Sequence, residues 1–317
     1  MYKDFYGFTE EPFGLGPDPG FLFLTENHKK ILNSLLDGVR NRKRFMLLTG
    51  ERGVGKTTLI RHFIPLLGEK IKAVEICRNF ETVEGIFETI LRELEIPVGE
   101  RSKSGMGEQL VEYLNQKAAT DAALVMVIDN AQDLSKEVLE ELRLLAGQDP
   151  RRASFLQEIF VGDSGIEEII RSEGLRQLAQ RIEVKCTVEP LNETESRQYI
   201  ESRLSRVGSE SSKVFTPAAL DLLCLHGKGI PRVINMICYL ALSTGYALSK
   251  KKVDSATVED ILSILGKQKP DWEPRGESSI QALADAFGKS PRIMKISYIL
   301  LAYSLISGII FFFFGRE

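Results

Sequence analysis

The chain has 317 residues, of which 43% are hydrophobic and 27% charged, with a formal net charge of −3. This composition excludes a wholly disordered chain, and the charge excludes overall attraction to nucleic acid or anionic lipid. Four cysteines without CxxC spacing and three isolated histidines indicate no metal or redox centre.

The first part of the chain predicts an arm, a helix and then a sheet. Residues Tyr2 to Phe23 are rich in Phe, Gly and Pro, which predicts an extended arm. The apolar spacing from Ile31 to Val39 then predicts a helix. Together the arm and the helix form a predicted N-terminal segment, residues 1–44. Five short apolar runs then alternate with helical patterns over residues 45–190, which predicts a three-layer α/β fold with a parallel sheet. The predicted strands are Phe45–Thr49, Ile71–Cys77, Ala123–Ile128, Phe155–Val161 and Ile182–Val188.

The strand patterns stop at Pro190, and residues 191–266 predict a small all-α domain. Asn192 and Glu195 are spaced as a capping box, which predicts a helix start. Thr216-Pro217 and Ile230-Pro231 predict two further helix starts, because proline is favoured at the first helical position. A fourth helix is predicted over Val258 to Leu265.

The last part of the chain predicts a membrane anchor. Residues 267–291 contain Pro, Gly and Ser and predict a linker, with a short helix at Ile280–Phe287. Nineteen uncharged residues follow from Ile296 to Phe314, and as a helix they would rise about 28 Å, close to the thickness of a bilayer core. We therefore expect a single transmembrane helix over 292–314, with a buried core helix as the alternative. Basic residues before this segment predict that the large N-terminal part stays in the cytoplasm.

A phosphate-binding loop is predicted after the first strand. Gly50 to Thr57 fits GxxxxGK[ST] between a strand and a helix, which is the context that makes this pattern specific. Lys56 is expected to reach the β and γ phosphates of ATP, and Thr57 to bind Mg²⁺. The residues expected to bind the nucleotide are Gly50, Glu51, Arg52, Gly53, Val54, Gly55, Lys56, Thr57 and Thr58.

A second candidate site follows the third predicted strand. Asp129 ends this apolar run, which places it at the sheet edge, where it is expected to join Thr57 in binding Mg²⁺. The alternative is a solvated aspartate without a role. Asn130 comes next, and its amide cannot act as a general base.

These residues, in this order, resemble the ExeA/GspA family of secretion-associated AAA+ ATPases, a branch near the origin-recognition ATPases. The likeness covers roughly residues 1–265. It is carried by Tyr6-Gly7-Phe8, Glu11-Pro12-Phe13, Pro17-Asp18-Pro19, Phe21 to Leu24, Leu48 to Thr57, Ile128 to Gln132, Leu178 to Ile182, Pro190-Leu191 and Gly229 to Asn235.

The resemblance implies roles for further residues. Arg232 corresponds to the sensor arginine that contacts the γ phosphate from the helical lid. Arg181 corresponds to the arginine finger offered to the ATP of a neighbouring subunit in a homo-oligomer, with Arg176 as the alternative, although either could be a surface residue. Asn130 stands where hydrolytic relatives carry a glutamate, and Asp163 stands where the family places a polar sensor, often glutamine. Both departures put rapid hydrolysis in doubt.

The leading interpretation is an ATPase anchored in the bacterial inner membrane that helps to assemble or regulate an envelope secretion or polysaccharide-export apparatus. One alternative is a scaffold that binds ATP without hydrolysing it. Another is a DNA-binding AAA+ regulator of the transposition type, with Arg143, Arg151 and Arg152 as its basic patch. The acidic pI and the predicted anchor argue against nucleic acid as a partner.

Overall fold

The computed structural model describes residues 2–14, 16, 19–77, 82–99, 101–118, 123–145, 152, 155–172 and 175–266. The chain divides into two compact units. Residues 17–190 form the sheet unit, whereas residues 1–16 and those from Leu191 onward form the helical unit. The predicted linker and transmembrane helix, 267–291 and 292–314, lie outside the described residues.

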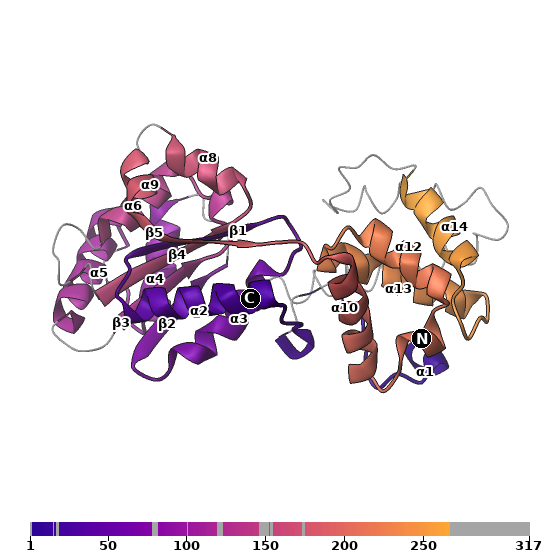
Figure 1. Ribbon diagram of the computed structural model, residues 1–317. Helices are drawn as coiled ribbons and strands as arrows, with labels where there is room; N and C mark the ends of the chain where they lie inside the picture. Colours follow the sequence, from indigo (N-terminus) through magenta and orange to yellow (C-terminus); the bar gives the residue numbers. More distant parts are fainter. Residues whose placement is uncertain are drawn as a thin grey trace. The chain divides into compact units, whose positions relative to one another are not determined.

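The sheet unit is built on five parallel strands in the order β2-β3-β4-β1-β5 (Figure 1). The strands are β1 Phe45–Gly50, β2 Ile71–Ile76, β3 Ala123–Ile128, β4 Leu156–Gly162 and β5 Ile182–Val188. Their bounds differ from the predicted ones by at most one residue at either end. The prediction succeeded most clearly for β1 and β3, which are buried along their whole length and therefore have mainly apolar sequences. The strand β4 is buried as well, although it contains Gln157 and Glu158.

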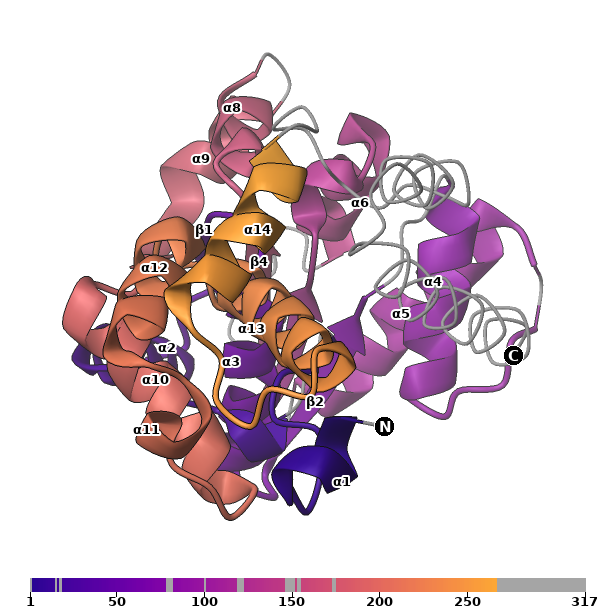
Figure 2. The same cartoon turned by 90° about the vertical axis from the view of Figure 1, so that its right-hand side faces the viewer.

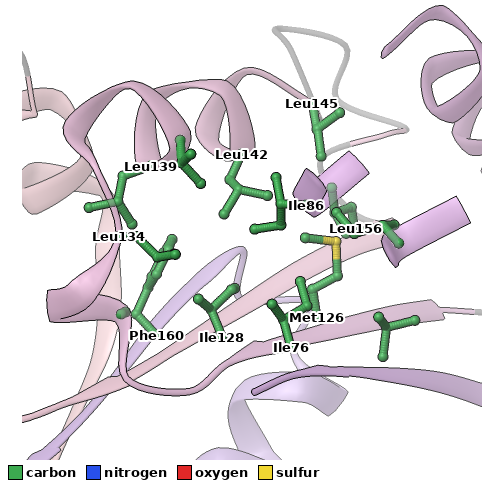
Figure 3. Close-up of a cluster of buried hydrophobic side chains, with 14 of the residues drawn as sticks. Ile76, Ile86, Met126, Ile128, Leu134, Leu139, Leu142, Leu145, Leu156 and Phe160 are labelled. Carbon is green, nitrogen blue, oxygen red and sulfur yellow. The ribbon is translucent and has the colours of Figure 1, made fainter. Parts of the chain in front are cut away.

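Helices cover both faces of this sheet, which confirms the predicted three-layer arrangement. On one face α4, α5, α6, α8 and α9 form the main hydrophobic core with the strands, and Figure 3 shows Leu139 and Leu142 of α6 above Ile128 and Phe160. On the other face lie α2 and α3, and α2 approaches so closely that a side chain at Gly38 would meet Met46. The helices of this unit are α2 Glu26–Arg40, α3 Lys56–Phe63, α4 Val83–Glu93, α5 Lys103–Lys117, α6 Lys136–Leu145, α8 Gly165–Arg171 and α9 Arg176–Arg181, with 3₁₀ turns η1 Pro19–Phe21, η2 Ile64–Leu67 and η3 Ala131–Asp133.

The helical unit contains the helices that the sequence predicts. Asn192 and Glu195 form the capping box of α10, and Thr216 caps α12 with Pro217 in its first turn. The helices are α1 Tyr2–Tyr6, α10 Glu193–Arg206, α11 Ser211–Val214, α12 Pro217–Gly227, α13 Pro231–Ala247 and α14 Ser255–Gly266.

The prediction of an extended arm at the N-terminus is wrong for Tyr2–Tyr6, which form α1. This short helix lies beside α13, as Figure 2 shows, and its aromatic rings pack edge to face on that helix. Tyr2 contacts Tyr239 at 5.5 Å and Phe5 contacts Tyr246 at 5.4 Å between ring centroids. The aromatic content of the arm therefore serves packing within the helical unit.

Candidate nucleotide-binding site

The carboxyl ends of three adjacent strands bring the predicted site residues together. In the sheet, β4 lies between β1 and β3. The phosphate-binding loop follows β1, Asp163 follows β4 and Asp129 follows β3. Because all strands are parallel, these segments meet at one edge, where open α/β sheets bind ligands.

The loop between β1 and α3 depends on glycine at its two ends. A side chain at Gly50 would lie 2.7 Å from the carbonyl oxygen of Val188. Gly55 has φ of +103° and precedes the first residue of α3, in a conformation that residues with a side chain rarely adopt. This backbone leaves the first N–H groups of α3 at the loop, where a phosphate could accept them.

Lys56 is folded onto its own loop. Its ammonium donates to the carbonyl oxygens of Gly50 at 2.8 Å and Glu51 at 3.0 Å, and the residue is 8% exposed. Burial lowers the pKa of Lys56, and this effect is partly offset by the negative charges of Asp129 and Asp163. A buried ammonium whose acceptors are loop carbonyls fits a site for an anion, because a phosphate oxygen would be a stronger partner than a carbonyl.

Thr57 and Asp129 meet as predicted. The Thr57 hydroxyl donates to Asp129 Oδ2 at 2.5 Å, and Asp129 Oδ1 accepts from the backbone N–H of Asn130 at 2.9 Å. One hydroxyl and one carboxylate fit Mg²⁺, which proteins hold through one or two side-chain oxygens together with substrate phosphates and water. Within the described part of the chain no group of three His, Cys, Asp or Glu side chains is placed to hold a metal. A cation here would therefore depend on the nucleotide for its remaining ligands.

Asn130 adopts a conformation that its sequence position does not reveal. Its φ and ψ are 54° and 42°, in the left-handed region, and it is exposed before the turn η3. Asparagine tolerates this region better than most residues. The amide is thus suited to the backbone at this position, in addition to lacking the carboxylate of a general base.

Asp163 has a counter-ion that the sequence analysis missed. Arg52 Nε lies 3.3 Å from Asp163 Oδ2, and the other carboxylate oxygen accepts from Gly165 N at 2.9 Å. Gln132 accepts from Asp163 N at 3.3 Å and so joins the segment after β3 to the end of β4. The signal in the sequence was an arginine inside the loop, which was expected only to bind the nucleotide.

The three arginines carried over from the resemblance are not brought to the loop within the sheet unit. Arg181 is exposed at the end of α9, directly before β5, and therefore lies at the amino edge of the sheet, opposite the loop. Arg176 is exposed at the start of the same helix. Arg232 is exposed in the first turn of α13, in the helical unit. Arg181 is therefore not placed beside the loop of its own subunit.

Comparison with known proteins agrees with this geometry. Residues 39–170 match the model of the AAA domain family. General secretion pathway protein A of Aeromonas hydrophila is 33% identical over 254 residues, which cover 80% of this chain and 46% of the relative. The chain thus contains a segment that matches the AAA domain model, and it is similar to general secretion pathway protein A. It spans about half the length of this curated relative.

Two solved structures are similar to this chain in fold. The Cdc6p structure from Pyrobaculum aerophilum has a TM-score of 0.62 at 17% identity, covering 97% of this chain and 90% of that one. The Aeropyrum pernix ORC1 protein in complex with DNA has a TM-score of 0.62 at 15% identity, covering 95% and 88%. At these identities the likeness concerns the fold alone.

The predicted basic patch can be compared in part with the described residues. Arg143, part of the proposed basic patch, has only 11% of its side chain exposed and bonds to Glu140 and Gln177, while Arg151 lies outside the described residues. Arg143 therefore offers little exposed charge to such a patch. No helix in the described part of the chain is both long and apolar enough to cross a membrane.

Proposed function

We propose that this chain is an AAA+ protein that binds MgATP at the loop Gly50–Thr57 and hydrolyses it. Lys56 binds the terminal phosphates, and the backbone N–H groups from Gly53 to Thr58 bind the phosphate chain. The observation that carries the proposal is the contact between the Thr57 hydroxyl and Asp129, because it joins the two Mg²⁺ ligands beside the phosphate loop.

Turnover is proposed to be slow. Asn130 can orient a water molecule through its amide but cannot take its proton, and general-base help is worth about 10²–10⁴-fold in rate. Long-lived ATP-bound assemblies follow from this chemistry. The same residue favours the second candidate function, a scaffold that binds ATP without hydrolysing it.

The assembly is proposed to be a homo-oligomer. Arg181 is placed at the opposite sheet edge from the loop of its own subunit, so as an arginine finger it acts in trans. Arg232 is proposed to contact the γ phosphate from the helical unit. Both roles rest on the family resemblance.

The cellular role proposed is help in assembling or regulating an envelope secretion or export apparatus from the bacterial inner membrane. Its support is the 33% identity to general secretion pathway protein A and the uncharged segment Ile296–Phe314. Nucleic acid is not proposed as the partner.

The test replaces the lysine and measures binding and turnover together. Lys56→Ala is expected to weaken MgATP binding by at least about a hundredfold, because a charge-assisted hydrogen bond contributes about 1.5–3 kcal/mol and the ammonium can make two to the phosphates. Titration calorimetry gives the Kd, and phosphate release at saturating MgATP gives the turnover.

Lys72→Ala is the matched control, since it removes an exposed lysine from β2 of the same unit. Melting temperatures of both variants show whether they are folded, because Lys56 is buried. Wild-type MgATP affinity in folded Lys56→Ala would contradict the assignment. Rapid phosphate release by the wild type would contradict only the proposal of slow turnover and would leave the assignment of the binding site intact.

A further inference from the structure

Two positive and two negative side chains lie close to one another at the phosphate-binding loop and the ends of β3 and β4. Asp129, Asp163 and Arg52 all act electrostatically on the Lys56 ammonium. Lys56 and Arg52 contribute two positive charges, which Asp129 and Asp163 cancel. A site for a highly charged anion is thus close to neutral before Mg²⁺ binds.

The Asp163 carboxylate is held in place on several sides. Arg52 Nε lies 3.3 Å from one oxygen, and Gly165 N donates to the other at 2.9 Å. The backbone of Asp163 donates to Gln132, whose own oxygen would be only 2.6 Å from any side chain added at Gly162. The carboxylate therefore cannot turn away from an incoming phosphate without breaking these bonds.

We propose that Asp163 is a specificity-determining residue that opposes the terminal phosphate, so that tight ATP binding requires Mg²⁺ more strongly than ADP binding does. Arg52 is its counter-ion. An incoming phosphate competes with Asp163 for Arg52, and the carboxylate freed in this way faces the same phosphate. This inference rests on the proposed function, because it presumes a nucleotide at the loop.

The size of the effect follows from charge and distance. ATP carries one more negative charge than ADP, and Mg²⁺ cancels two of them. Unit charges about 7 Å apart, at an effective dielectric constant between about 20 and 80, change an equilibrium by roughly three- to fiftyfold. The loss of affinity caused by the charge of Asp163 should be largest for free ATP, smaller for free ADP and smallest for MgATP.

The experiment measures the Kd of ATP and ADP, each in Mg²⁺ and in EDTA, for the wild type and for Asp163→Asn. Asparagine keeps an oxygen for Gly165 N and loses only the charge. We expect Asp163→Asn to lower the Kd of free ATP by roughly three- to fiftyfold. The Kd of free ADP should fall by less, and the Kd of MgATP should fall least. Asp37→Asn is the matched control, because it removes the same charge from a second Asp–Arg pair, with Arg40 Nη1 at 3.4 Å on α2.

A second variant keeps the test decisive if Asp163→Asn does not fold. Arg52 is exposed. We expect Arg52→Gln to weaken the binding of free ATP more than the binding of free ADP. If Asp163→Asn folds, the two effects on the Kd should not add in Arg52→Gln/Asp163→Asn, because each residue is the other's partner.

Two outcomes overturn the inference: unchanged Kd of free ATP in Asp163→Asn, or an equal change for ATP, ADP and MgATP. Additive effects in the double variant overturn the role of Arg52 as the counter-ion. Failure of the wild type to bind any of these nucleotides would instead overturn the proposed function, so the two failures are distinct.

Discussion

Glu158 lies in β4 with no exposed surface, and neither of its carboxylate oxygens has a hydrogen-bond partner among the described residues. Burial raises its pKa to about 8, although the positive charges of Arg44 and Arg143 act in the opposite direction. A carboxyl group with a raised pKa binds its proton more tightly in the folded protein than in the unfolded chain. Its contribution to stability is therefore present at low pH and is lost as the pH rises toward 8.

Replacing Glu158 with glutamine tests this linkage. Glutamine has the shape of glutamate but cannot ionise. We therefore expect the free energy of unfolding of Glu158→Gln to increase relative to that of the wild type as the pH rises from 6 to 9. The gain should be at most roughly 1.4 kcal/mol for each pH unit between the pKa of the unfolded chain and the pKa of the folded protein. Urea denaturation at several pH values measures it. Glu168→Gln, an exposed glutamate on α8, is the control, and parallel curves for Glu158→Gln and the wild type would contradict the prediction.

Single residues also show what the sequence could and could not give. Thr57 and Asp129 were predictable as neighbours, because parallel strands bring their carboxyl ends to one edge. The pairing of Arg52 with Asp163 was not, since it depends on the direction of a loop side chain. Glu158 offered a signal that went unused, because it and Gln157 interrupt the apolar run between Leu156 and Ile159.

At the scale of elements, the turn between α12 and α13 is fixed by a close approach of two backbone segments. Leu191 N donates to Gly229 O at 2.8 Å, and Gly229 has φ of +70°. A side chain at Gly229 would lie 2.0 Å from the carbonyl oxygen of Leu191. The start of α13, which carries Arg232, therefore depends on glycine at this position.

Gly229→Ala is expected to destabilise the protein by about 2–4 kcal/mol, from left-handed strain together with the backbone clash. Gly208→Ala is the control, because Gly208 has φ of +82° but nothing within 4 Å of an added side chain. That variant should lose only the strain, about 1–2 kcal/mol. Chemical denaturation of both variants provides the comparison, and equal losses would show that the approach to Leu191 is unimportant.

Elements with a strong local pattern were predicted well, and elements that depend on distant partners were not. The strands and the capped helices α10 and α12 carry their signals within a few residues. In contrast, α1 is a helix of five residues whose rings pack on Tyr239 and Tyr246, far along the chain. Its local composition of aromatic residues and glycine suggested an extended segment because those partners could not be seen.

At the scale of the whole molecule, the expected anchor concerns residues outside the described part of the chain. We expect removal of the residues after Arg292 to release the protein from membranes, because the uncharged segment is then absent. Fractionation of cells after a salt wash measures this, with nucleotide binding by the truncated protein as evidence that it is folded. A truncated protein that still sediments with washed membranes would show that another part of the chain binds them.

The helical unit is discontinuous along the chain, because residues 1–16 belong with those after Leu191 and the sheet unit lies between them. During translation the sheet unit leaves the ribosome with all of its strands before any of helices α10 to α14 exist. The rings of Tyr2 and Phe5 lack their partners Tyr239 and Tyr246 until α13 has been synthesised. The nascent protein thus completes its phosphate-binding loop first and closes its N-terminal aromatic cluster last.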